Sequence, residues 1–107
     1  MAIVLLSCWA AKQNDVERIG RKAKGLLEKH GAQFEVARIF SGTNSGEFLT
    51  SIRFVDWERF GRAMYALSRD DEFQGAVAEA NRVGELRERN IVATIDLGAD
   101  LHSEYLS

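Results

Sequence analysis

The feature that most constrains the fold of this chain is a series of short strands that are apolar on both faces. Residues 3–10 show this most clearly, since both alternating sets of side chains there are apolar: Ile3, Leu5 and Trp9 in one set, and Val4, Leu6, Cys8 and Ala10 in the other. Such a run is typical of a central strand that is buried above and below its sheet. The helical segments of the chain can cover only one of those two faces.

The first helix is predicted just after this strand. Asn14 and Glu17 have the spacing of a capping box, and apolar residues then recur at helical intervals as far as His30. Gly31 supplies a left-handed stop. Gly20 and Gly25 lie inside the helix, where we expect them to allow close packing on the sheet.

A second helical region follows the middle strands. Asp56 is the predicted cap of a helix that carries apolar residues at helical spacing. Residues 68–72 then predict a break and a fresh start, which continues as far as Gly84.

Two alternating segments, residues 34–40 and 48–55, flank a polar loop at 41–47 and predict an antiparallel hairpin. Placing Phe40 opposite Phe48 pairs Phe34 with Phe54 and Glu35 with Arg53. The last strand is predicted over residues 89–97, and residues 98–107 form a tail to which no structure is assigned.

The resulting order, strand–helix–strand–strand–helix–strand, predicts an α+β, ferredoxin-like antiparallel sheet with the first and third strands central and both helical regions on one face. Residues 1–97 form its single domain. The other face would remain in water in a monomer. Burying about 800 Å² per partner would contribute roughly 20 kcal/mol before the costs of association, so we expect a homodimer.

Composition excludes several classes of protein. The net charge is −2 and the chain has one cysteine, no proline and no apolar run long enough to span a membrane. We therefore expect no nucleic-acid partner, no membrane partner and no intrachain disulfide, and we place the protein in the cytoplasm.

The stretch Phe60-Gly-Arg-Ala-Met-Tyr-Ala-Leu-Ser-Arg-Asp-Asp-Glu-Phe73, together with the order of elements over residues 3–97, resembles the dimeric α+β barrel superfamily. This group includes the antibiotic-biosynthesis-type monooxygenases and the NIPSNAP-like domains. The resemblance implies face-to-face pairing of two sheets and a pocket between sheet and helices. Haem-degrading relatives carry an iron-binding histidine in the second helical stretch, but residues 56–83 contain none. We expect neither haem nor another cofactor.

Five residues are candidate ligand contacts, each with a structural alternative. Glu35 and Arg53 either form an exposed ion pair or orient a polar ligand. Arg38 either extends from the sheet edge into water or anchors an acidic group. Trp9 and Tyr65 either line the pocket or pack in the core.

No residue spacing indicates a nucleophile triad or a metal site. Two functions therefore stay open: a homodimer that binds a small apolar or weakly acidic metabolite, and a cofactor-independent monooxygenase or isomerase. RNA binding, which uses the same strand order, is disfavoured by the negative charge and by the few aromatic residues of the third strand.

Overall fold

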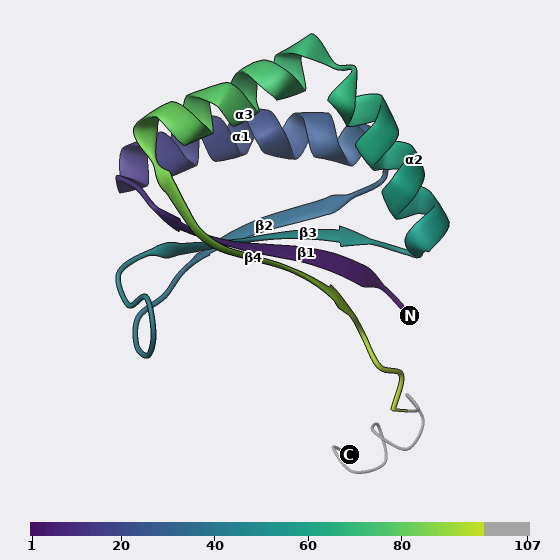
Figure 1. Ribbon diagram of the computed structural model, residues 1–107, viewed down its shortest axis with the longest axis horizontal. Coiled ribbons are helices and arrows are strands. Elements are labelled where there is room, and N and C mark those ends of the chain that lie inside the picture. The colour runs from purple at the N-terminus through teal and green to yellow at the C-terminus, as the bar shows by residue number, and fades with distance from the viewer. Residues whose placement is uncertain (98–107) are drawn as a thin grey trace.

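The structure, a computed structural model, describes residues 1–97 and is an α+β fold with one sheet and one layer of helices (Figure 1). The sheet order is β2-β3-β1-β4, and each neighbouring pair is antiparallel. This is the predicted ferredoxin-like arrangement, with the first and third strands central. The elements in chain order are β1 (Ile3–Ala10), α1 (Gln13–Lys29), β2 (Gln33–Arg38), β3 (Phe48–Phe54), α2 (Trp57–Ser68), α3 (Asp71–Val83) and β4 (Glu85–Ala93).

The ends of α1 match the sequence prediction at only one terminus. Gly31 adopts φ +78°, and its backbone N–H donates to the carbonyl of Glu28, so the left-handed stop is confirmed. The predicted capping box is wrong, because α1 begins two residues earlier than predicted, with Lys12 as its N-cap, and no side chain caps it. The Asn14 side chain instead accepts a hydrogen bond from the neighbouring Asp15 N–H at 3.0 Å.

The break between α2 and α3 lies where the sequence predicted it. Asp56 caps α2 by accepting from the Arg59 N–H at 2.8 Å, and Asp70 caps α3 by accepting from the Phe73 N–H at 3.1 Å. Gly84 alone separates α3 from β4. A Cβ at this position would meet the carbonyl oxygen of Ala10 at 3.2 Å, a tight contact, so this glycine favours close approach to the end of β1.

The predicted bounds of the last strand were wrong. The prediction was residues 89–97. β4 instead begins at Glu85 and ends at Ala93, so both ends lie four residues earlier than predicted. The early start follows from the one-residue turn at Gly84, which leads directly into pairing with Ala10. The predicted tail, residues 98–107, lies outside the described residues.

The predicted hairpin register was wrong by two residues. Phe34 lies opposite Ile52, and Phe48 lies opposite Arg38. Phe40 therefore belongs to the connection, where Ile39 and Glu47 close the loop through an N–H to carbonyl bond of 2.8 Å. A shift of two residues leaves every side chain on its predicted face, because the side-chain period of a strand is two.

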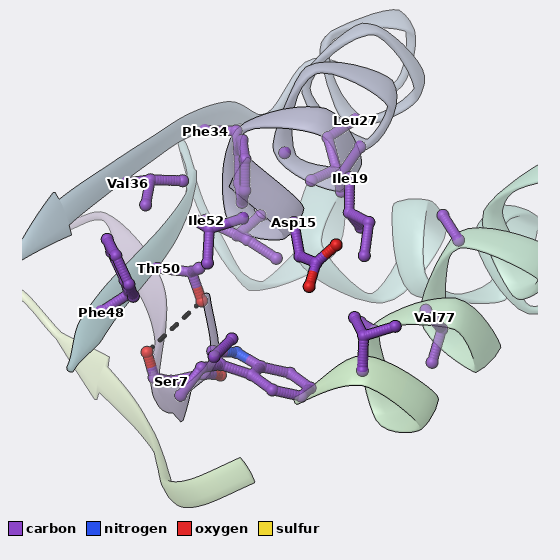
Figure 2. A pocket seen from close by; sticks show the side chains of 18 of the residues that line it. Ser7, Asp15, Ile19, Leu27, Phe34, Val36, Phe48, Thr50, Ile52 and Val77 are labelled. Atoms are coloured by element: carbon purple, nitrogen blue, oxygen red, sulfur yellow. Dashed lines mark hydrogen bonds between the residues drawn. The ribbon is translucent and has the colours of Figure 1, made fainter. Parts of the chain in front are cut away.

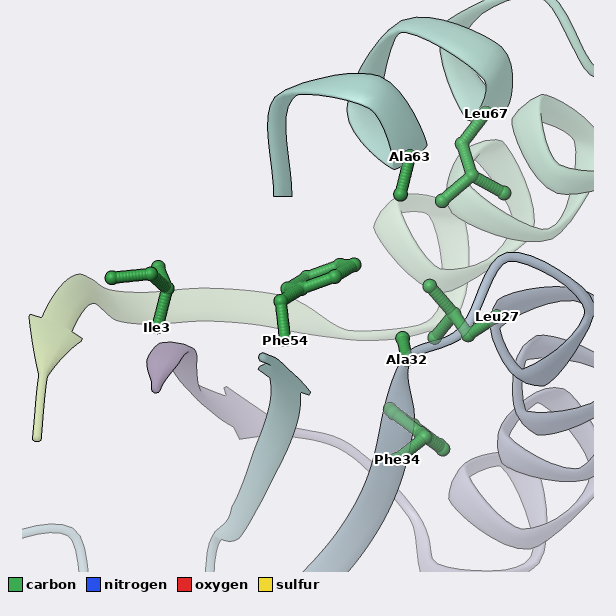
Figure 3. Close-up of a cluster of buried hydrophobic side chains, with 7 residues drawn as sticks. All are labelled: Ile3, Leu27, Ala32, Phe34, Phe54, Ala63 and Leu67. Carbon is green, nitrogen blue, oxygen red and sulfur yellow. The ribbon is translucent and has the colours of Figure 1, made fainter. Parts of the chain in front are cut away.

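The hydrophobic core lies between the sheet and the helices (Figure 3). Phe54 and Leu27 are each 1% exposed, and Ile3 and Leu67 are likewise enclosed. The Phe54 ring meets the Phe60 ring edge to face at a centroid distance of 5.3 Å. The core therefore joins β1 and β3 to α1 and α2.

The opposite face of the sheet carries no helix among the described residues (Figure 1). Alternation along the strands places Val4, Leu6, Cys8 and Leu49 at its centre. Its margins are polar, however, since Glu35 of β2, Arg53 of β3 and the Glu88 and Asn90 positions of β4 point to the same side. The expectation of apolar side chains on both faces of every strand therefore holds for β1 and is wrong for the edge strands.

Candidate functional site

A pocket lies between the sheet and the helices α1 and α3, as the resemblance implied (Figure 2). Its cavity volume is about 150 Å³. The walls are almost entirely apolar, with Ile19 of α1, Val77 of α3 and Phe34, Phe48 and Ile52 of the strands among them. An apolar cavity of this size accommodates a small hydrophobic body.

Polar groups meet the pocket at its sheet side. Ser7 is 4% exposed, and it is the sole buried polar residue of the described chain. Its hydroxyl accepts a hydrogen bond from Arg89 Nε at 3.1 Å, and its carbonyl oxygen accepts from the Thr50 hydroxyl at 3.4 Å. Arg89 makes no ion pair with a carboxylate of residues 1–97. Its charge is thus available to a ligand.

One carboxylate, Asp15 of α1, also lines the pocket and points toward its interior in Figure 2. Arg18 donates to Asp15 at 2.9 Å and also pairs with Glu79 of α3. These ion pairs hold α1 against α3 on either side of the cavity. They also fix the Asp15 side chain at the pocket wall.

A second, more open groove runs between α1 and the edge strand β2, with a volume of about 500 Å³. Arg38 lies in this groove, with its guanidinium carbon 5.8 Å from the centre of the Phe48 ring. Its Nη1 donates to the amide oxygen of Gln13 at 3.2 Å. We refer to this space below as the outer groove, and to the first cavity as the inner pocket.

The five candidate residues from the sequence do not converge on one site. Trp9 lines the inner pocket and Arg38 lines the outer groove. Glu35 and Arg53 lie on the opposite face of the sheet, and they are not direct partners, because Glu35 faces Ser51. Tyr65 lies on α2, 65% exposed, with its hydroxyl accepting from Arg69 at 2.7 Å.

Sequence reasoning did not select Ser7, Asp15 or Arg89. Ser7 had a recognisable signal, because it is the one polar residue in an otherwise apolar strand. Asp15 was included in the supposed cap of α1, and Arg89 was taken as the start of the last strand. Only the pairing of β4 with β1 brings Arg89 beside Ser7.

Cys8 is the free thiol of this chain and lies on the helix-free face. Burial raises the pKa of the thiol, and Glu47 raises this pKa further, because its carboxylate accepts a hydrogen bond from Sγ at 3.5 Å and repels a thiolate. The thiol is therefore protonated and unreactive near neutral pH.

Within residues 1–97, His, Cys, Asp and Glu side chains form no cluster that could hold a metal ion. None of the helices in this range has the length and apolar character that a membrane crossing requires.

Solved structures share this architecture. SnoaB, a cofactor-independent oxygenase from Streptomyces nogalater, in its N63A mutant form, superposes with a TM-score of 0.68 at 9% identity, over 87% of this chain and 92% of that one. A NIPSNAP domain protein from Burkholderia xenovorans gives 0.68 at 14% identity, over 92% and 99%. A NIPSNAP family protein from Agrobacterium tumefaciens gives 0.67 at 10% identity, over 92% and 98%.

These similarities define the class of fold. The chain shares the ferredoxin-like α+β fold of SnoaB and the NIPSNAP proteins, and the resemblance noted from the sequence is confirmed at the level of this fold. No protein-family model matches the sequence, and no curated protein is significantly similar to it.

Proposed function

We propose that this protein binds a small, apolar, weakly acidic molecule in the inner pocket. The observation that carries the proposal is the combination of apolar walls with one polar end, where Ser7 and Arg89 lie. An apolar body would be held by exclusion of water, and a phenol, enol or carbonyl oxygen would take hydrogen bonds from Arg89. Few polar groups placed against apolar walls are the usual composition of a small-molecule site.

Native mass spectrometry of the protein purified from cells tests this proposal directly. We expect a retained mass, and binding of hydroxylated aromatic compounds by the apo protein in calorimetric titrations. Arg89→Gln should weaken that binding about fivefold or more, since a charge-assisted hydrogen bond is lost. Arg82→Gln, on the exposed side of α3, is the matched control. Absence of both a retained mass and any binding would refute the proposal.

A second candidate function is cofactor-independent oxygenation, and Asp15 is the observation that favours it. A carboxylate at the wall of an apolar pocket can remove a proton from a phenolic substrate. The resulting phenolate carries carbanion character at its para carbon, where O2 adds. The O–O bond then breaks: one oxygen atom stays on that carbon as a quinone carbonyl, and the other leaves as water with the phenolic proton and the hydrogen of that carbon. SnoaB, whose fold this chain shares, is a cofactor-independent oxygenase.

Oxygen consumption with hydroxylated aromatic compounds distinguishes the two functions. If the protein is an oxygenase, uptake should be abolished by Asp15→Asn and unaffected by Glu28→Gln, a carboxylate on the exposed side of α1. Binding without oxygen consumption in the wild-type protein would leave the binding function alone.

We also propose that two copies pair through the helix-free face of the sheet. An apolar centre around Leu6 and Leu49, surrounded by polar margins, is the composition of a protein–protein interface. Val92 and Ile91 provide a matched test, because these neighbours on β4 point to opposite faces and are 39% and 52% exposed. Light scattering should give about twice 12.0 kDa for the wild type and for Ile91→Lys, but near 12.0 kDa for Val92→Lys. A wild-type mass of one chain would refute the pairing.

A further inference from the structure

The inner pocket and the outer groove are neighbouring spaces that share five lining residues. Val16 and Gly20 of α1 line both of them, as do Phe34 and Val36 of β2 and Phe48 of β3. A ligand that occupied both spaces would pass these shared residues, between α1 and the sheet edge. The two volumes, about 150 Å³ and about 500 Å³, leave more room outside than inside.

The two parts of this space differ in charge. The outer groove is lined by three basic side chains, Arg21, Lys24 and Arg38, and by one carboxylate, Glu17. The chain as a whole has a net charge of −2, so this local excess of positive charge opposes the overall balance. A cationic rim around an apolar opening attracts the anionic end of an amphipathic molecule.

The basic side chains are not equally committed to partners. Lys24 pairs with Glu28 at 2.9 Å, whereas Arg21 reaches Glu17 only at 3.9 Å with its side chain 77% exposed. Arg38 forms no ion pair with a carboxylate of the described chain. Its guanidinium is nevertheless positioned, by the Phe48 ring and by the Gln13 amide. Ordering a long side chain beforehand lowers the entropy cost of binding an anion.

We infer that the ligand is an elongated amphipathic molecule, with an apolar body in the inner pocket and an anionic group, a carboxylate or a phosphate, held by Arg38 in the outer groove. This inference rests on the proposed binding function and specifies its ligand class. The polar end of the inner pocket, at Ser7 and Arg89, would bind a hydroxyl or carbonyl group of the same molecule. Arg89 and Arg38 would therefore contact opposite ends of the ligand.

Three probes that differ only in the end group test the inference: hydroxyphenylbutanoate, the corresponding butyl phosphate and the neutral butanamide. Fluorescence of Trp9, which lines the inner pocket, reports binding in a Trp57→Phe background, because the chain has two tryptophans. Retention of the signal change in Trp9→Phe, which keeps only Trp57, would identify a different binding place and overturn the assignment.

We expect the wild-type protein to bind either anion about fivefold more tightly than the amide, with a preference that declines as salt is added. Arg38→Gln should remove that preference, whereas Lys22→Gln, an exposed cation of α1 outside both spaces, should retain it. A carboxylate preference without a phosphate preference, or the reverse, would assign the natural end group.

Equal affinities for anion and amide in the wild-type protein would overturn the inference and leave the proposed function intact. The inference would also be overturned if the preference for the anions over the amide survived Arg38→Gln but was lost in Arg89→Gln. The anionic group would then lie in the inner pocket beside Arg89. Failure of all three probes to bind, together with the absence of a retained mass in native mass spectrometry, would instead refute the proposed function itself.

Discussion

Replacing Gly20 or Gly25 with alanine tests how α1 packs on the sheet. Both glycines lie inside α1, where alanine is favoured by about 1 kcal/mol. A Cβ at Gly20 would lie 3.7 Å from Val36 Cγ2 and 3.9 Å from Phe34 Cε2, which are ordinary van der Waals contacts. A Cβ at Gly25 would meet nothing within 4 Å. Neither site is therefore a close contact, and the sequence-based explanation of these glycines is wrong.

We expect Gly25→Ala to stabilise the protein by about 1 kcal/mol through helix propensity alone. Gly20→Ala should add to this the burial of one methyl group, worth at most about 0.8 kcal/mol. Urea unfolding gives these differences directly, and each kcal/mol should raise the melting temperature by about 4–8 °C in a domain of this size.

The two variants should differ in ligand binding. Gly20 lines the junction of the inner pocket and the outer groove, whereas Gly25 lines neither. A methyl group at Gly20 therefore narrows the passage, and Gly20→Ala should weaken binding of hydroxyphenylbutanoate while Gly25→Ala leaves it unchanged. Loss of stability in Gly20→Ala alongside a gain in Gly25→Ala would refute the reasoning, because α1 would then lie closer to β2 than these distances state.

Four further predictions concern stability and the free thiol. Phe54→Ala should cost about 3–5 kcal/mol in urea unfolding, because this ring is 1% exposed and its loss leaves a cavity at the centre of the core. Asp70→Ala should cost about 1 kcal/mol by removing the cap of α3, and Asp70→Asn should restore most of it. Backbone and side-chain hydrogen bonding to Arg59 holds the pKa of Asp56 below its ordinary value of 3.8. The Asp56 carboxylate therefore stabilises the folded protein above pH 3.8, and this contribution is lost as the pH falls through the lower pKa of the folded state. Asp56→Asn should make the unfolding free energy less sensitive to pH in this acid range. Glu47→Gln should lower the pKa of the Cys8 thiol and speed its alkylation above neutral pH, whereas Glu85→Gln should not; equal alkylation rates in all three proteins would contradict the part assigned to Glu47.

The order of elements could be predicted because strands and helices differ in the spacing of their apolar residues, and because most of them are bounded by recognisable start and stop residues. Asp56 and Asp70 begin helices, and Gly31 ends one, through local hydrogen bonds that depend on neighbouring residues only. Such features can be read from a single sequence. The start of α1 was missed because Lys12, its N-cap, has no capping side chain to reveal it.

The hairpin register could not be settled from the sequence. Registers that differ by two residues place the same side chains on the same faces, so the alternating pattern fits both. The structure is decided by contacts remote in sequence, in which Phe54 lies opposite Ile3 and Phe48 lies opposite Trp9. The loop also absorbs more residues than expected, with Asn44 at φ 64° among its left-handed positions.

The inner pocket was predicted in outline, through the resemblance, but its polar residues were not. Ser7, Thr50 and Arg89 come from three strands, and only the strand order brings them together. Glu35 and Arg53 were chosen because they have opposite charges in the expected register. Their position on the helix-free face places them outside both the inner pocket and the outer groove, and charge complementarity along a strand could not reveal which face they occupy.

Gly84 is the whole connection between α3 and β4, so the end of the helix and the start of the strand stay within one residue of each other. Val77 and other side chains of α3 form one wall of the inner pocket, while β4 provides an edge of the face through which we propose that two copies pair. The wall of the inner pocket and the edge of the proposed pairing face are thus joined through the backbone of a single glycine.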